Sequence, residues 1–210
     1  MRCRGFTLIE VLTVIVIIVL LSALAFPSFS SARAAAQRAK TKVMFSQWST
    51  AVAAFESDYG FAPRFGDAQL VNEGAGAALS SDHLFHDLLA GCHRDGSALA
   101  DSTDPRSAAA QNPRHVAFHV FAESEIAPDG HVRDATGNEE IAVVVDEDGD
   151  GLVKAGTDFD HLPVVHAADG TALIPTAADF PASGVRAGVI FYAADSSASA
   201  TNPLLVLSWK

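Results

Sequence analysis

Residues 1–29 read MRCRGFTLIEVLTVIVIIVLLSALAFPSF, and the apolar run within them decides how the chain is organised. From Phe6 to Phe26 the run carries a single charged residue, Glu10. A bilayer core requires about 20 consecutive apolar residues in a helix. Pro27 follows directly, and because proline has no backbone N–H, it bends or ends a helix there. The sequence therefore predicts a membrane-spanning segment over residues 6–26 with a kink at Pro27.

The apolar pattern continues past Pro27 with gaps of three or four residues, which is the spacing of one helical face. We therefore expect one helix from Phe6 to Asp58, roughly 80 Å long. Gly60 and Pro63 are expected to end it. Since a bilayer core is only about 30 Å thick, the second half of this helix must pack against a soluble domain.

The charge of the chain is unevenly distributed along its 210 residues. The first 60 residues carry a net charge of +3 and the remainder −14, which together give −11. An acidic distal part argues against nucleic acid as a partner, because phosphate contacts require clustered Lys and Arg. It is compatible with a soluble domain and with a bound divalent cation.

Three interpretations compete for the N-terminal segment. A secretory signal peptide fits the basic start and the small residues at 23–25, but not the length of the apolar run or Glu10. A plain membrane anchor explains the length and leaves Glu10 unexplained, although an unpaired carboxylate at membrane depth is costly. A prepilin signal accounts for both features.

The segment Arg4-Gly5-Phe6-Thr7-Leu8-Ile9-Glu10 resembles the class III leader of type IV pilins and type II secretion pseudopilins. In that family a short basic leader ends in glycine, the mature chain begins with phenylalanine, and its fifth residue is glutamate. Pro27 falls where these proteins often carry a helix-bending proline. The resemblance covers roughly residues 1–60.

The resemblance implies cleavage after Gly5 by a prepilin peptidase, N-methylation of Phe6 and assembly into a filament. It implies the following organisation: leader 1–5, transmembrane and filament-core helix 6–26, soluble half of the helix 27–59, and a pilin-like head 60–210. The implied partners are the peptidase, homologous subunits, an inner-membrane assembly platform and membrane lipid. The implied location is the bacterial inner membrane, crossed once, with the head outside the cytoplasm. Cys3 would leave with the leader, so Cys92 would have no cysteine partner.

Two functional alternatives stand beside the secretion pseudopilus. One is a type IV or competence pilus, which the absence of a Cys-bounded C-terminal loop makes the weaker choice. The other is a calcium-binding surface or adhesion module carried on a pilin anchor.

Within the family interpretation, Glu10 has a specific role in subunit docking. Cleavage frees the amine of Phe6, which can hold a proton near membrane depth. Pairing this amine with Glu10 of a neighbouring subunit brings together two charges that are each costly alone. Assembly in the correct register would then be favoured. A pair within one chain is the alternative.

Beyond residue 60, short strand candidates dominate. Five stretches rich in β-branched or aromatic residues are separated by Gly, Pro, Asp and Asn. They are HVAFHVF (115–121), IAVVV (141–145), LPVVH (162–166), AGVIFYAA (187–194) and PLLVLSW (203–209). Because no long helix separates them, they predict a small antiparallel sheet and an α+β fold. One face of the sheet is expected to cover the apolar stripe of the long helix, with Trp48 and Phe55 in the core or in subunit contacts.

Residues 61–110 predict loops and one short helix. The segment SSDHLFHDLLAG (80–91) offers Ser or Asp as an N-cap, apolar residues at helical spacing, and Gly91 as a stop. Residues 96–113 are polar and rich in turn formers, so we expect a mobile surface loop there.

Residues 146–151, DEDGDG, begin like a calcium loop. Alternating carboxylates converge on a hard cation, and glycine permits the sharp turn. The twelfth position is Thr157 instead of the glutamate of an EF-hand, and a strand precedes the loop where an EF-hand has a helix. The loop resembles the calcium sites of some secretion pseudopilins, which bind calcium near the loops of their sheet. The expected ligands are Asp146, Asp148 and Asp150, with Asp158 or Asp160 folding back; a solvated acidic turn is the alternative.

His83, His86, Cys92 and His93 form a second cluster. Their spacing permits a zinc site but matches no strong zinc signature, and the alternative is surface histidines with a packed thiol. The sequence has no Gly-rich phosphate loop, no G-x-S-x-G and no H-E-x-x-H motif. Its Ser, His and Asp residues are scattered, so we expect a structural protein rather than an enzyme.

Overall fold

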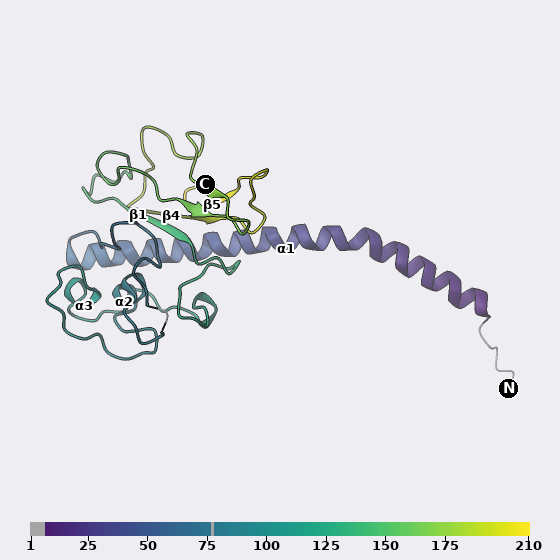
Figure 1. The fold of residues 1–210 in the computed structure, drawn as a ribbon, viewed down its shortest axis with the longest axis horizontal. Helices are drawn as coiled ribbons and strands as arrows, with labels where there is room; N and C mark the ends of the chain where they lie inside the picture. Colours follow the sequence, from purple (N-terminus) through teal and green to yellow (C-terminus); the bar gives the residue numbers. More distant parts are fainter. Residues whose placement is uncertain (1–6, 77) are drawn as a thin grey trace. The chain divides into compact units, whose positions relative to one another are not determined.

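The computed structural model describes residues 7–76 and 78–210, without the side chains of residues 23–31. The described chain is α+β, as predicted, and contains these elements: α1 Leu8–Tyr59, α2 Leu84–Ala90, α3 Ala108–Gln111, a 3₁₀ turn Glu123–Glu125, β1 Ile141–Val145, β2 Val165–His166, β3 Ala172–Leu173, β4 Val189–Ala194 and β5 Leu205–Leu207 (Figure 1). Residues 1–37 and residues 38–210 form two separate compact units.

The prediction of one long N-terminal helix is confirmed by α1. The helix continues through position 27, and it ends where Gly60 takes a positive φ of 78°. The expected kink at Pro27 lies outside the residues whose side chains are described. Among the residues that the structure describes, no helix is long and apolar enough to span a bilayer. A span over 6–26 stays a prediction.

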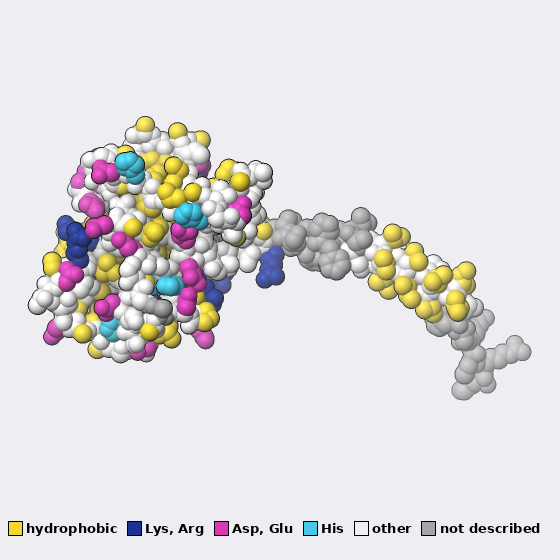
Figure 2. All heavy atoms as spheres, in the orientation of Figure 1, with side chains coloured by type: hydrophobic (Ala, Val, Ile, Leu, Met, Phe, Trp, Pro, Cys, Tyr) yellow, Lys and Arg dark blue, Asp and Glu magenta, His cyan; other side chains and the backbone are white. Residues whose placement is uncertain are grey.

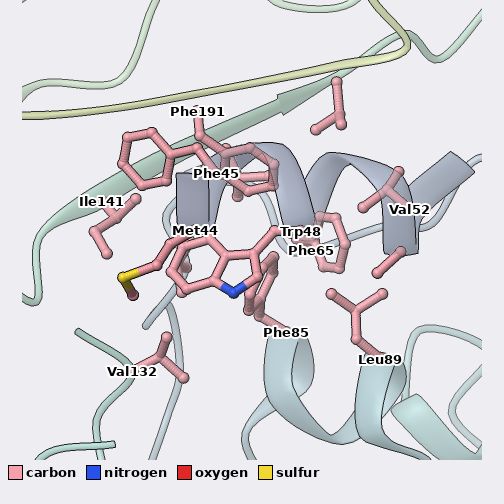
Figure 3. Close-up of a cluster of buried hydrophobic side chains, with 14 of the residues drawn as sticks. Met44, Phe45, Trp48, Val52, Phe65, Phe85, Leu89, Val132, Ile141 and Phe191 are labelled. Atoms are coloured by element: carbon pink, nitrogen blue, oxygen red, sulfur yellow. The ribbon is translucent and has the colours of Figure 1, made fainter. Parts of the chain in front are cut away.

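The core of the second unit is built around Trp48 of α1, which is fully buried. Its indole lies 5.7 Å from the ring of Phe45, 5.3 Å from that of Phe85 and 5.6 Å from that of Phe191, measured between centroids. Phe85 belongs to α2 and Phe191 to β4, so this part of α1 has the sheet on one side and α2 on the other (Figures 1 and 3). Burial of each large apolar side chain contributes about 1.5–3 kcal/mol, which holds the three elements together. The placement of Trp48 and Phe55 in the core is confirmed.

The main sheet is antiparallel and has the order β1-β4-β5. All residues of β1 and β4 are buried, because both faces of the sheet are covered. Val143 and its partner Phe191 face α1, whereas Ala142 and its partner Tyr192 face a cluster that includes the β2–β3 hairpin. The sheet therefore covers the stripe of α1 as expected, and it also carries a second core that the sequence analysis did not anticipate.

The strand predictions hold best where an apolar run is continuous. The predicted strand 141–145 matches β1 residue for residue. Three others are shorter than predicted, and β3 was not predicted at all. The shortened strands are Val165–His166, Val189–Ala194 and Leu205–Leu207.

The predicted strand 115–121 is wrong, because this segment has no regular structure. His115 takes a positive φ of 52°, which no strand residue adopts. The Phe118 N–H donates to the carbonyl of Leu89 at 2.8 Å, so the segment follows the end of α2 instead of a neighbouring strand. Val120 is 84% exposed.

The predicted helix in residues 80–91 is confirmed as α2, with Gly91 in the left-handed C-cap position. The prediction of Ser or Asp as its N-cap is wrong. His83 caps the helix, and the His83 imidazole accepts the His86 N–H. Residues 96–113 are also not a loop throughout, because α3 lies within them and Asn112 is fully buried. Asn112 donates to the carbonyls of α2 and the following segment, which ties this region to the core.

Candidate functional site

The first candidate site is the apolar start of α1. Within residues 8–21 every large apolar side chain is at least 49% exposed: Leu8, Ile9, Val11, Leu12, Val14, Ile15, Val16, Ile17, Ile18, Val19, Leu20 and Leu21. Figure 2 shows these hydrophobic side chains covering the face of the segment that is in view. A helix that is apolar on all sides has no polar face for water. This surface therefore requires an apolar environment, either lipid or other helices.

Glu10 stands in the first turn of α1 and interacts with Thr7. Its Oε2 accepts the Thr7 N–H at 2.8 Å and the Thr7 hydroxyl at 2.8 Å, while the Thr7 hydroxyl accepts the Glu10 N–H at 3.3 Å. This reciprocal arrangement is a capping box, and its sequence signature is T-x-x-E at residues 7–10. Glu10 thus has a local structural role besides the predicted role in docking. Gly5 and Phe6, the predicted cleavage and methylation sites, lie outside the described residues.

The second candidate site is the acidic loop that follows β1. Asp146 is 5% exposed; its Oδ1 accepts the Gly149 N–H at 2.8 Å and its Oδ2 accepts the Gly151 N–H at 2.7 Å. Gly149 and Gly151 both have positive φ, the conformation that glycine was predicted to permit here. Asp158 folds back, as one alternative predicted, and its carboxylate is 3% exposed. Asp146, Asp148 and Asp158 each place an oxygen within 4.8 Å of the others.

The other two predicted ligands of this loop do not join the group of three. Asp150 instead forms an ion pair with Lys154, whose ammonium also lies 3.7 Å from Asp148 Oδ2. Asp160 is exposed and lies outside the group. The hydrogen bond from Lys154 lowers the pKa of Asp150, and Asp150 in turn raises the pKa of Lys154. Lys154 thus supplies a positive charge where a calcium ion was expected.

The four residues of the histidine and cysteine cluster do not converge. His83 is 1% exposed and donates from Nε2 to Asn72 Oδ1 at 2.8 Å, which leaves neither ring nitrogen for a metal. Burial is the main reason that the pKa of His83 falls to about 3. His86 is 4% exposed and pairs with Asp87. The alternative of surface histidines is therefore wrong for both, and the structure brings His93 to Asp87 instead.

Residues 1–26 match the prokaryotic N-terminal methylation motif, the signal of type IV pilins and pseudopilins. This match confirms the predicted family resemblance over the segment that carries it. The motif implies processing by prepilin peptidase and assembly into pilin-like filaments, and proteins with this motif are structural. No curated protein and no solved structure matches the chain.

Proposed function

We propose that this chain is a structural subunit of a type II secretion pseudopilus. In this proposal, residues 6–26 anchor the subunit in the bacterial inner membrane with the head outside the cytoplasm, and they later form the core of the filament. The all-round exposed apolar surface of residues 8–21 is the observation that carries the proposal. It would be buried by lipid before assembly and by neighbouring helices afterwards.

Glu10 would set the register of assembly by accepting the amine of Phe6 from a neighbouring subunit. The capping box supplies a competing explanation for this carboxylate, because a glutamate at this position accepts the backbone N–H of Thr7 at the start of its own helix. The two explanations differ in what they require. Docking requires the negative charge, whereas capping requires only a hydrogen-bond acceptor.

Three variants separate these roles. Glu10→Gln keeps an acceptor for the cap and removes the charge, Glu10→Ala removes both, and Thr7→Val removes the capping hydroxyl and keeps the charge. We expect loss of filaments with both Glu10 variants and normal filaments with Thr7→Val, as seen by electron microscopy of sheared cells. Filaments of normal number and length in Glu10→Gln would overturn the docking role. Mass analysis of the mature N-terminus should find methylated Phe6.

The choice of secretion over a surface or competence pilus rests on the absence of a Cys-bounded C-terminal loop from the sequence. Deletion of the gene should abolish export of a subset of proteins and leave twitching and DNA uptake intact. Loss of motility or of DNA uptake with normal export would favour the pilus alternatives.

We also propose that the acidic loop binds calcium through Asp146, Asp148 and Asp158. Their carboxylates are the oxygen donors that calcium prefers, and they converge within 4.8 Å. Because Lys154 lies beside Asp148, calcium must displace this ammonium, so affinity is expected to be weak. Calorimetry should show tighter binding in Lys154→Gln, lost binding in Asp148→Asn and unchanged binding in Asp160→Asn. Equal affinity in all four proteins would contradict the site and, with it, the calcium-dependent adhesion alternative.

A further inference from the structure

A pocket of about 520 Å³ lies beside α2 and is lined by residues from both ends of that helix. Asp82 precedes α2, Asp87 is within it, and His93 follows it. All three line the pocket, and each offers one ligand atom within 4.8 Å of the other two. The pocket therefore contains a mixed set of two carboxylates and one imidazole that the filament function does not use.

The imidazole of His93 lies close to both carboxylates. His93 Nδ1 lies 2.8 Å from Asp87 Oδ2 and 4.0 Å from Asp82 Oδ1. Two ligand atoms that are each about 2.1 Å from a metal ion lie roughly 3 to 4 Å apart, depending on the angle between them. An ion between these atoms would replace the hydrogen bond between His93 Nδ1 and Asp87 Oδ2, and these two atoms would move apart to the spacing of ligands.

Asp87 is the buried carboxylate of this group, and no Lys or Arg among the described residues contacts it directly. This carboxylate is 1% exposed, accepts the His83 N–H at 3.1 Å and pairs with the imidazoles of His86 and His93. In the described part of the chain, no Lys or Arg forms an ion pair with Asp82 or Asp87. The buried Arg94 donates to backbone carbonyls and acts on Asp87 only through space: burial lowers the pKa of Arg94, and the charge of Asp87 opposes this shift. The acidic loop differs, because Lys154 supplies its positive charge.

We propose that Asp82, Asp87 and His93 bind a divalent transition-metal ion of the zinc type, with water in the remaining positions. An imidazole nitrogen with carboxylate oxygens suits Zn²⁺, whereas Ca²⁺ and Mg²⁺ prefer oxygen ligands alone. The ion links the loop before α2 to the loop after it. Its expected role is to stabilise the α2 region of the head, and this role is independent of filament assembly.

Calorimetric titration of the purified full-length chain with Zn²⁺ tests the proposal. We expect one ion per chain and, at a hundredfold excess over Kd, an increase in Tm of about 5 °C or more. Asp82→Asn and His93→Gln should each weaken Zn²⁺ binding at least tenfold. The Asp82 side chain is 99% exposed, so its variant should fold normally without metal.

Two matched controls define the site. Asp101→Asn removes another exposed carboxylate of the same pocket and should leave Zn²⁺ affinity unchanged. Asp148→Asn should also leave it unchanged, because the acidic loop is a separate site. Co²⁺ can replace Zn²⁺ as a spectroscopic probe, and its spectrum should lack a thiolate charge-transfer band if Cys92 is not a ligand.

The proposal is overturned if Zn²⁺ does not bind the folded chain. It is equally overturned if binding survives in both Asp82→Asn and His93→Gln, or is lost in Asp148→Asn.

Discussion

The indole N–H of Trp48 donates to Oε1 of Glu125 at 3.0 Å, and both side chains are buried. Trp48 belongs to α1, whereas Glu125 ends a 3₁₀ turn far along the sequence. Glu125 Oε2 also accepts the Ala122 N–H, and Oε1 lies 3.4 Å from His119 Nε2. The hydrogen bond therefore fastens a long irregular segment to the central helix of the head.

Trp48→Phe should destabilise the head by about 1–3 kcal/mol, because it deprives a buried carboxylate oxygen of a donor. The change also removes part of a large ring, so a double-mutant cycle with Glu125→Ala, which removes the acceptor, is needed. Urea unfolding should show coupling between the two changes. Strictly additive effects would mean that the hydrogen bond contributes nothing beyond packing.

Glu56 should destabilise the folded head at neutral pH. Burial and the nearby charge of Asp146 raise its pKa, and its Oε1 is buried without a hydrogen-bond partner. The folded state then holds the proton more tightly than the unfolded state, so stability falls as pH rises through the folded pKa. Glu56→Gln should stabilise the protein by up to about 1 kcal/mol at pH 7. The gain is limited because the Glu56 side chain is only partly buried and solvent screens its charge.

Thermal melts at pH 4 and pH 7 check this prediction, because the gain from Glu56→Gln should vanish at pH 4. Glu123→Gln, at an exposed site, is the control and should have no effect at either pH. If Glu56→Gln stabilised the protein equally at pH 4 and pH 7, the stabilisation would come from packing rather than from charge.

His83 should make the head sensitive to acid. Its pKa falls to about 3, chiefly through burial, from a usual value near 6.5. The unfolded chain therefore binds the proton more readily, and stability should fall as pH decreases from about 6.5 towards 3. The loss should approach about 1 kcal/mol per pH unit.

His83→Gln should make stability depend less on pH between pH 4 and pH 7, whatever its effect on stability at pH 7. His161→Gln, at an exposed position, is the matched control and should leave the slope unchanged. Urea midpoints between pH 4 and pH 7 provide the measurement. An unchanged slope in His83→Gln would show that another group causes the acid sensitivity.

Two glycines with similar backbone angles should differ in their tolerance of alanine. Gly91 and Gly96 have φ of 70° and 82°, so each substitution incurs about 1–2 kcal/mol of backbone strain. A Cβ at Gly91 would also lie 2.5 Å from the carbonyl oxygen of His115, whereas at Gly96 it would meet nothing within 4 Å. Gly91→Ala should therefore be the costlier by at least about 1 kcal/mol in chemical unfolding. Equal costs would show that the 115–121 segment moves freely.

Those parts of the molecule that depend on neighbouring residues in the chain could be predicted from the sequence. The three-to-four spacing of apolar residues predicted α1, the continuous run 141–145 predicted β1, and Gly91 predicted the end of α2. The methylation motif over residues 1–26 is local in the same sense, since its charge, glycine and apolar run are contiguous.

The sites, in contrast, depend on which distant groups packing brings together. The alternation in 115–121 is typical of a strand, but this segment finds its hydrogen-bond partner at the end of α2, and no strand lies beside it. Histidines three residues apart suggested a shared metal, yet burial committed His83 to Asn72 and left Asp87 to face His93. A helical period or a cleavage motif is set by contiguous side chains, so the sequence alone determined the long helix and the processing signal. Only the tertiary structure decided which carboxylates share a pocket and which charge balances them, because burial and hydrogen bonding join residues that the chain order keeps apart.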